Sequence, residues 1–286
     1  MRSTDSLPIL LVTKNIRYAT GSPVKGEDYW EVRRPRIISE LIFNTSHCPE
    51  SFICLQEVLH GQLVDILAGL NASGKKWAYI GVGRDDGHQA GEYSPIIYEP
   101  SVWELKSCET IWLSETPDRP SKGWDAACIR LLTIGVFQHY ETKKRLAAMC
   151  THLDHMGTKS RLESAKIILA QVDKLKDDVN GVFLAGDFNS PPDTEAYKHM
   201  TGHGSPMYDL RSSVPEDQRY GHTLTFSGFQ GKPLNRIDFL FLNHGCQTSS
   251  GKTGWTVNQY AVLENRFEDG VYNSDHRAVV GDVELQ

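Results

Sequence analysis

The sequence predicts a single α/β domain in which a pair of β-sheets is flanked by helices. Two observations support this fold class. Short apolar runs that end abruptly in polar residues recur along the 286 residues, and such runs are typical of buried strands. Patterns with helical spacing lie between them, so strands and helices are mixed over the whole length. No linker or low-complexity segment interrupts the chain, and we therefore expect residues 1–286 to form one domain.

The strands are predicted from the apolar runs. These are ILLVTKNIRY (9–18), FICLQEV (52–58), AAMCTHLDH (147–155), VFLAGDFN (182–189) and RIDFLFL (236–242). Their apolar side chains are expected to hold the sheets together. Their terminal polar residues are expected to project from one rim, where open α/β architectures place their ligands.

Three segments have the apolar spacing of amphipathic helices. The residues that share a face are Ile37, Ile38, Leu41 and Ile42, then Leu63, Ile66, Leu67 and Leu70, and finally Leu162, Ala165, Leu169 and Val172. In the third segment Ser160 is followed three residues later by Glu163. This pattern is that of a capping box, and it predicts Ser160 as the N-cap.

Composition and charge limit the functional classes. A net charge of −6 argues against binding to nucleic acid through bulk charge, although a local basic patch stays open. No apolar run approaches the roughly 20 residues of a membrane helix, and the N-terminal run is too short for a secretory signal. We therefore expect an intracellular, cytoplasmic protein with no membrane span and no evident obligate protein partner. The six cysteines include no C-x-x-C pair, which favours reduced thiols over a zinc knuckle or disulfides.

Eight polar residues stand at or just beyond apolar runs. They are Asn15, Glu57, His152, Asp187, Asn189, Asp238, Asp275 and His276. A single strand-end Asp or Asn is usually a turn or helix cap, but eight residues at the same kind of position are hard to explain in that way. Their oxygen atoms suit Mg²⁺, Mn²⁺ or Ca²⁺, and histidines with Asp partners supply a general base and an electrophile. Such a set can activate water for attack on phosphorus.

The motif GDFN places two of these side chains close together in sequence. Asp187 and Asn189 are two residues apart at the end of an apolar run. Because alternate residues of a strand face the same side, we expect both side chains to point in one direction.

Several motifs, taken in order, resemble those of the endonuclease/exonuclease/phosphatase superfamily. They are NIRY, LQEV, THLDH, GDFN, RIDFLF and SDHRAV, and they extend from residue 15 to residue 280. This superfamily includes deoxyribonuclease I, apurinic endonucleases, inositol phosphatases, neutral sphingomyelinases and deadenylases. GDFN followed by SDH is the most specific part. The resemblance implies a four-layer α/β/β/α sandwich, with two packed, mainly antiparallel sheets flanked by helices as in deoxyribonuclease I.

The resemblance also implies a metal site. Glu57 would be its principal carboxylate, with Asn15 beside it and Asp275 as a ligand or a neighbour of one. Some members carry an acidic residue two positions after the first Asn, where this chain has Arg17. This departure favours a single Mg²⁺, for which Mn²⁺ could substitute. Arg17 would then contact substrate phosphate, or form a surface salt bridge.

The remaining strand-end residues would carry out the catalysis that the resemblance implies. Asp187 would orient or deprotonate the attacking water, and Asn189 would hold the phosphate or a metal-bound water. His276 would contact the scissile phosphate or act as a base, with Asp238 orienting it. His152 would bind phosphate oxygens and stabilise developing charge.

Substrate contacts are expected from loops near the same rim. The Gly-rich segment 81–98 lies between two predicted strands, a position that often carries specificity. The candidates from this and neighbouring loops are Arg84, Tyr93, Ser94, Trp124, Arg130, Asp154 and His155. Each has an alternative, since a Trp is more often packed in the core and Asp154 and His155 could belong to a solvated turn.

These observations predict a Mg²⁺-dependent phosphoester hydrolase. Its substrate partner would be a nucleic acid, in the manner of a nuclease acting on RNA or DNA ends (3′–5′ exonuclease-like), or a small phosphorylated molecule, in the manner of a sugar, nucleotide or lipid phosphatase. The alternative of another class is a catalytically silent scaffold of the same fold. Loss of Glu57, Asp187 or His276 would mark such a scaffold, and all three are present.

Overall fold

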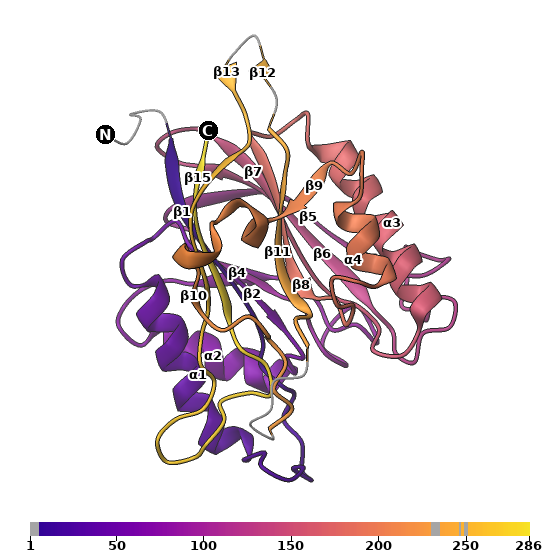
Figure 1. The fold of residues 1–286 in the computed structure, drawn as a ribbon. Coiled ribbons are helices and arrows are strands. Elements are labelled where there is room, and N and C mark those ends of the chain that lie inside the picture. The colour runs from indigo at the N-terminus through magenta and orange to yellow at the C-terminus, as the bar shows by residue number, and fades with distance from the viewer. Residues whose placement is uncertain (1–5, 230–234, 246, 249–250) are drawn as a thin grey trace.

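The computed structural model describes residues 6–229, 235–245, 247–248 and 251–286. Two β-sheets pack face to face, and helices cover their outer faces (Figure 1). The first sheet contains, in spatial order, β10 (Tyr220–Gly221), β14 (Trp255–Val262), β15 (Val279–Leu285), β1 (Leu7–Asn15), β2 (Phe52–Gln56), β4 (Ile96–Tyr98) and β3 (Ala78–Ile80). The second contains β5 (Trp103–Trp112), β6 (Leu131–His139), β7 (Arg145–His152), β8 (Gly181–Asp187), β11 (Asp238–Asn243) and β9 (Met207–Asp209).

The helices are divided between the two sides of this sheet pair. They are α1 (Trp30–Thr45), α2 (His60–Asn71), α3 (Thr158–Leu175) and α4 (Glu195–Thr201). Short elements complete the described chain, namely the 3-10 turns η1 (Leu210–Ser213) and η2 (Glu216–Gln218) and the small hairpin of β12 (Gln247–Thr248) and β13 (Gly251–Lys252). The α/β class and the sandwich predicted from the sequence are confirmed.

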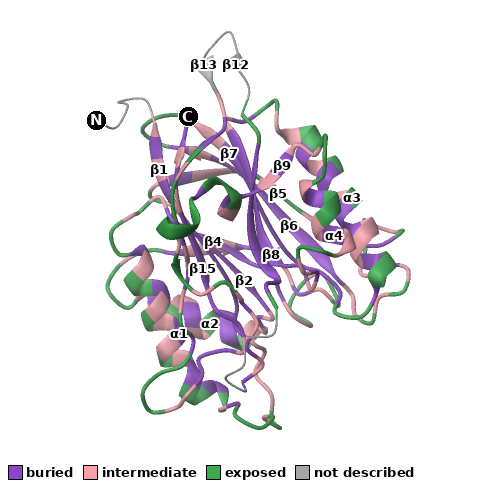
Figure 2. Cartoon of the chain, viewed as in Figure 1, coloured by how far each residue is buried: buried purple, intermediate pink, exposed green. Residues whose placement is uncertain are grey.

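Three apolar clusters fill the three interfaces of the four layers. The cluster between the sheets contains Phe52 and Phe183, whose ring centroids lie 5.4 Å apart. The second joins α3 to the six-stranded sheet through Ile168, and the third joins α1 to the seven-stranded sheet through Ile37. Figure 2 shows the central strands largely buried and the helices exposed on their outer sides, whereas β5 and β14 carry exposed residues. Burial of both sheet faces explains why most strands read as continuous apolar runs.

Strand register brings the predicted rim together. β1 runs parallel to β2 and pairs Asn15 with Gln56, so Asn15 and Glu57 leave the sheet side by side. β8 is parallel to β7 and antiparallel to β11, which pairs Asp187 with both His152 and Asp238. Polar residues that are far apart in sequence therefore meet at one edge.

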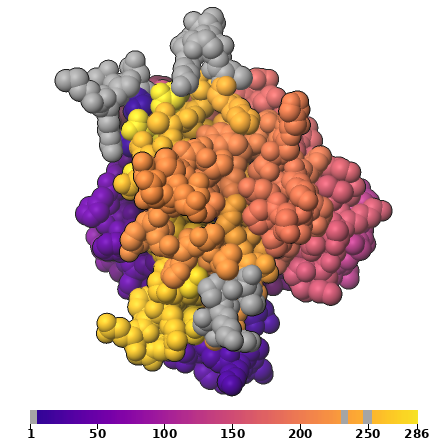
Figure 3. All heavy atoms as spheres, viewed as in Figure 1, coloured from indigo at the N-terminus to yellow at the C-terminus, as the bar shows by residue number. Residues whose placement is uncertain are grey.

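The C-terminal third of the chain contributes strands to both sheets. In the space-filling view these segments, coloured orange to yellow, cover the middle of one face between the N-terminal segments and α3 (Figure 3). β11 adds to the six-stranded sheet and β15 to the seven-stranded sheet. Asp238 begins β11, and His276 lies just before β15, so both sheets support the site.

Two details of the helix predictions are wrong. Ile42 is 42% exposed, because it lies at the margin of the apolar face of α1. Helix α3 begins at Thr158, and Ser160 is not its N-cap. Instead, the backbone N–H groups of Lys159 and Ser160 donate to the Asp125 carboxylate, at 3.2 and 2.7 Å. The cap is supplied by a distant loop, which local sequence patterns do not reveal.

Two further expectations concern cysteines and membrane spans. Cys54 and Cys150 are buried, and the five cysteines within the described residues are free thiols. Cys246 lies outside the described residues. In the part of the chain that the structure describes, none of the helices combines the length and apolarity that crossing a membrane requires.

Candidate active site

A cavity of about 540 Å³ opens at the rim where the strands end. Its lining contains ten of the predicted site residues, namely Arg17, Glu57, Arg84, Arg130, His152, His155, Asp187, Asn189, Asp275 and His276. Asn15 and Asp238 lie directly behind this lining and hydrogen-bond to members of it. Twelve residues from eight separate motifs or loops thus converge on one place.

The centre of the site is a buried Asp–His–Asp arrangement. His276 Nδ1 lies 2.9 Å from Asp238 Oδ2, and its Nε2 lies 3.7 Å from Asp187 Oδ2. Burial alone would lower the pKa of His276, but the charges of Asp238 and Asp187 outweigh it and raise the pKa to about 10. His276 is therefore an imidazolium at neutral pH, and Asp238 fixes its orientation. These three side chains present ligand atoms within 4.8 Å of one another, a spacing that could also hold a metal ion.

Asp187 is the most closely surrounded carboxylate. Its Oδ2 accepts a hydrogen bond from Asn15 Nδ2 at 3.0 Å, and its Oδ1 accepts the backbone N–H of Asn189 at 2.9 Å. Burial, together with the negative charge of Asp238, raises the pKa of Asp187 to about 7. A carboxyl group with this pKa can exchange a proton near neutral pH, which is what a general base requires.

Asn189 does not lie on the strand. The expectation that strand alternation points Asn189 and Asp187 in the same direction is therefore wrong. β8 ends at Asp187, and Asn189 has a positive φ of 47° on the following turn. The hydrogen bond from its own backbone N–H to Asp187 closes this turn. The turn nevertheless presents Asn189 Nδ2 to His152 Nε2 at 3.1 Å and to the carbonyl of Leu153 at 3.0 Å.

His152 is a neutral imidazole. Burial, followed by the nearby charges of Arg130 and Arg84, lowers its pKa well below the usual value. Because Asn189 donates to Nε2, the hydrogen-bond network assigns the ring proton to Nδ1. Its Nε2 also lies 3.4 Å from Asp187 Oδ2. We call the space between His152, Asp187 and His276 the attack centre, and the His152 ring forms one of its walls.

An acidic group adjoins Asp187, because Asn15 Nδ2 donates to both Glu57 and Asp187. Asn15 Nδ2 donates to Glu57 Oε1 at 3.0 Å, and the backbone N–H of Tyr18 donates to Glu57 Oε2 at 3.2 Å. Burial and the charge of Glu57 are among the causes that raise the pKa of Asp275. Arg17 lines the cavity and also bonds Glu27 through Nε at 3.0 Å, while its Nη1 lies 3.9 Å from Glu57. Arg17 thus makes a salt bridge without leaving the site.

Four predicted substrate contacts are absent from the cavity lining, namely Tyr93, Ser94, Trp124 and Asp154. Tyr93 is 2% exposed, and its hydroxyl donates to the carbonyl of His88 at 2.8 Å. The Trp124 side chain is absent from the cavity lining, and its backbone N–H bonds Glu115. The Asp154 carboxylate accepts four backbone N–H groups, from residues 127, 128, 156 and 157. Asp154 therefore supports the loops around the cavity, although its Oδ2 lies 3.7 Å from Arg130 Nε.

Several residues of the lining were not predicted from the sequence. These are Tyr18, Glu92, Cys128, Phe226 and Ile237. Glu92 could have been found, because it adjoins Tyr93 in the Gly-rich segment and pairs with Arg84, whose Nη1 donates to Glu92 Oε2 at 2.7 Å. Phe226 packs on the ring of His276 at 4.9 Å between centroids, and no local pattern marks a contact across 50 residues.

Comparison with known proteins agrees with this geometry. The sequence model described as the endonuclease/exonuclease/phosphatase family matches residues 30–276. The chain belongs to this family. No curated protein matches it.

Solved structures from Bacteroides are similar to this family member over nearly its whole length. A family protein of Bacteroides vulgatus has 30% sequence identity and a TM-score of 0.83, with 98% of this chain and 100% of the other covered. One from Bacteroides thetaiotaomicron has 29% identity and a TM-score of 0.84, covering 98% and 99%. The mannosyl-6-phosphatase of Bacteroides thetaiotaomicron has 30% identity and a TM-score of 0.81, covering 96% and 99%.

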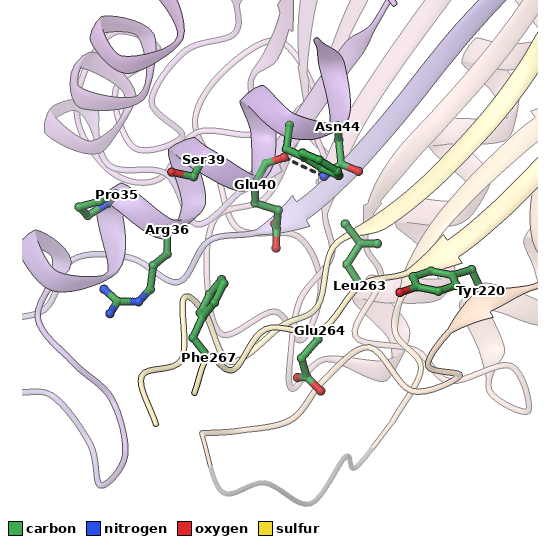
Figure 4. A pocket seen from close by; sticks show the side chains of 10 residues that line it. Pro35, Arg36, Ser39, Glu40, Asn44, Tyr220, Leu263, Glu264 and Phe267 are labelled. Carbon is green, nitrogen blue, oxygen red and sulfur yellow. Dashed lines mark hydrogen bonds between the residues drawn. The ribbon is translucent and has the colours of Figure 1, made fainter. Parts of the chain in front are cut away.

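A second, more apolar cavity of about 550 Å³ lies between α1 and the segment that follows β14 (Figure 4). Phe43, Tyr220, Leu263 and Phe267 are among its lining residues, and Phe43 is 77% exposed. Its lining contains none of the strand-end residues described above. The strand-end residues therefore line the first cavity and not this one.

Proposed function

We propose that this protein is a Mg²⁺-dependent phosphoester hydrolase whose substrate is a small phosphorylated molecule, with a sugar phosphate as the favoured class. The observation that carries the hydrolase proposal is the adjoining placement of two groups in one cavity. A His276 cation and a protonatable Asp187 face the same space as the Glu57–Asp275 carboxylates. This combination supplies a proton acceptor, an anion contact and oxygen ligands together.

The carboxylate wall fits a divalent cation. Glu57 and Asp275 concentrate negative charge there, and the charge of Glu57 is one of the causes that raise the pKa of Asp275. A cation would stabilise this arrangement. Glu57 and Asp275 are oxygen donors of the kind that Mg²⁺ takes, and Asn15 holds the Glu57 carboxylate through Nδ2. The buried Asp187–Asp238–His276 group is the less suitable site, because the hydrogen bond between Asp238 and His276 already occupies those atoms. When bound, the ion would polarise a phosphoryl oxygen and lower the pKa of water.

The chain's own residues then have definite roles. Asp187 accepts a proton from the attacking water at Oδ2, with Asn15 holding the carboxylate in place. His276 donates a charged hydrogen bond to the phosphoryl group from Nε2, since Asp238 binds Nδ1. Asn189 and His152 line the same space, from the turn after β8 and the end of β7. The Asn189 amide donates to His152 Nε2 and to the carbonyl of Leu153, so the two residues shape the wall beside the phosphoryl group.

Two observations favour a small substrate. The cavity of about 540 Å³ is of the size of small-molecule sites. The mannosyl-6-phosphatase of Bacteroides thetaiotaomicron, at 30% identity, is named for a sugar phosphate. The net charge of −6 does not favour a nucleic-acid groove. Cleavage of RNA or DNA ends stays a prediction, and the test below includes it.

The test is a hydrolysis panel with purified protein. We would offer sugar phosphates, nucleotides, phosphodiesters, labelled single-stranded RNA, and single- and double-stranded DNA, with Mg²⁺, Mn²⁺ or EDTA. We expect metal-dependent release of phosphate from a sugar phosphate, lost in Glu57→Gln and retained in the surface control Glu104→Gln. Preferred cleavage of an oligonucleotide would replace the phosphatase by a nuclease. No turnover of any substrate, with metal binding absent, would support the silent scaffold.

A further inference from the structure

A buried arginine beside the attack centre has unsatisfied hydrogen-bond donors. The Arg130 side chain is 5% exposed, yet among the described residues its Nε and Nη1 atoms have no hydrogen-bond partner. Its Nη2 contacts His155 Nδ1 at 3.3 Å. The neighbouring Arg84 likewise has an unpartnered Nε within the described chain. Buried donors are rarely left unpaired without a functional reason, and these two side chains line the cavity.

The charges around these donors are already balanced. Glu92 Oε2 accepts from Arg84 Nη1 at 2.7 Å and lies 3.9 Å from Arg130 Nη1. Asp154 Oδ2 lies 3.7 Å from Arg130 Nε. Asp85 Oδ1 also lies 3.7 Å from Arg84 Nε. Carboxylates thus already face both guanidinium groups, so a second anionic group would gain little and would meet Glu92. A neutral ligand that both donates and accepts hydrogen bonds fits better, because Glu92 accepts and Arg130 donates.

The position of this group relates it to the bond that is cleaved. Glu92 Oε2 lies 3.8 Å from His152 Nδ1, and His152 Nε2 lies 3.4 Å from Asp187 Oδ2. One imidazole ring therefore separates the donors and acceptor from the attack centre. A ligand held there would be the part of the substrate attached to the phosphate.

The loop that carries Arg84 and Glu92 is held in place before any ligand binds. The backbone N–H of Arg84 donates to the carbonyl of Glu92 at 3.1 Å, and Trp112 Nε1 donates to the carbonyl of Arg84 at 2.8 Å. A rigid arrangement loses little entropy on binding, which favours specific recognition.

We propose that Glu92, Arg130 and Arg84 form a polyol subsite that binds the ring hydroxyls of the sugar attached to the scissile phosphate. A pair of neighbouring hydroxyls donates to the Glu92 carboxylate and accepts from the free N–H groups of Arg130. This subsite rests on the proposed function, since it selects among substrates of the same phosphoester hydrolase.

The experiment compares two phosphomonoesters with the same kind of scissile bond. Mannose 6-phosphate and n-hexyl phosphate are both primary alkyl phosphates, and only the first carries hydroxyls. We would measure kcat/KM for both with Mg²⁺, using wild type, Glu92→Gln, Arg130→Lys and the exposed control Arg119→Lys, each checked for folding by circular dichroism. Wild type is expected to prefer the sugar phosphate at least about 100-fold, because hexyl phosphate leaves the buried polar groups unpaired.

The proposal predicts that Glu92→Gln and Arg130→Lys each lower this preference at least about tenfold, while Arg119→Lys does not. If one variant fails to fold, the other decides. A wild-type preference near one, or variants that slow both substrates in parallel, would overturn the subsite and leave the hydrolase standing. Preferred cleavage of a nucleotide or oligonucleotide would also overturn it. Failure to hydrolyse any phosphoester would instead remove the proposed function itself.

Discussion

Replacing Asp238 by Asn tests the centre of the site most directly. Asp238 Oδ2 lies 2.9 Å from His276 Nδ1, and it is the largest of the causes that raise the pKa of His276. The pKa rises from 6.5 to about 10, which corresponds to about 5 kcal/mol in favour of the charged ring. The charge of Asp187 is the next largest cause that raises the pKa of His276. Without Asp238, the charge of Asp187 is the main effect that still counteracts the lowering of the His276 pKa by burial. We therefore expect this pKa to fall to neutral pH or below.

The sign of the effect follows from the direction of this shift. In the wild type the imidazolium is present below about pH 10 and is lost as the pH rises through that value. In Asp238→Asn the cation should be lost at a much lower pH, so activity at pH 8 should fall at least about 100-fold. Activity at pH 6 should be retained better than activity at pH 8, because part of the His276 population regains its proton there.

The assay is a profile of kcat/KM from pH 5.5 to 9.5 for the wild type, Asp238→Asn and Asp173→Asn, an exposed control that loses the same formal charge. The His276 ring would be titrated in parallel by NMR. The reasoning is refuted if Asp238→Asn keeps the wild-type alkaline limb, or if the ring in the variant still titrates near pH 10.

Three further predictions concern the supports of the site. Asp154→Asn should lower the free energy of unfolding in urea by about 2 kcal/mol at pH 7, because four backbone N–H groups outweigh burial and lower the pKa of Asp154 to about 2. This difference should persist above about pH 4 and shrink as the pH falls toward 2, and a difference that grows in acid would contradict it. Arg33→Lys should lower the free energy of unfolding by at least about 2 kcal/mol and slow turnover. The reason is that the buried Arg33 guanidinium donates to five backbone carbonyls that hold the loops after β1 and β14. Equal melting temperatures of the wild type and the variant would rule this out. Glu57→Gly should be more stable than Glu57→Gln by about 1 kcal/mol, while both lack activity. Glu57 has a φ of 58°, which glycine adopts without strain. A higher melting temperature for Glu57→Gln than for Glu57→Gly would contradict this.

Much of the fold could be predicted because the strands are buried on both faces. The strands β1, β2, β7, β8 and β11 then read as apolar runs that end in polar residues, whereas β5 and β14 carry exposed polar residues. The parallel pairing of β1 with β2 and of β7 with β8 places such ends at one edge, so Asn15, Glu57, His152 and Asp187 could be grouped from sequence alone. Their individual roles stay predictions.

The rest of the site depends on contacts that no local pattern records. Asp125 caps α3 from 35 residues away, and Phe226 packs on His276 from a different loop. Glu92 becomes part of the site only because the Gly-rich loop folds back and pairs it with Arg84. In each case the residue type is ordinary, and its function follows from a register or turn that the tertiary structure sets.

The backbone itself shows where tertiary structure overrides local preference. Six residues other than glycine have a positive φ in the described chain, and three of them, Arg17, Glu57 and Asn189, line the cavity. For Asn this conformation is common, but for Arg and Glu it costs free energy that a glycine would avoid. The strain turns the side chains after β1 and β2 toward the rim, where the backbone N–H of Arg17 bonds Asn15 and that of Tyr18 bonds Glu57. A site assembled for stability alone would use glycine at these two turns, so the choice of Arg and Glu is best explained by the chemistry of the side chains.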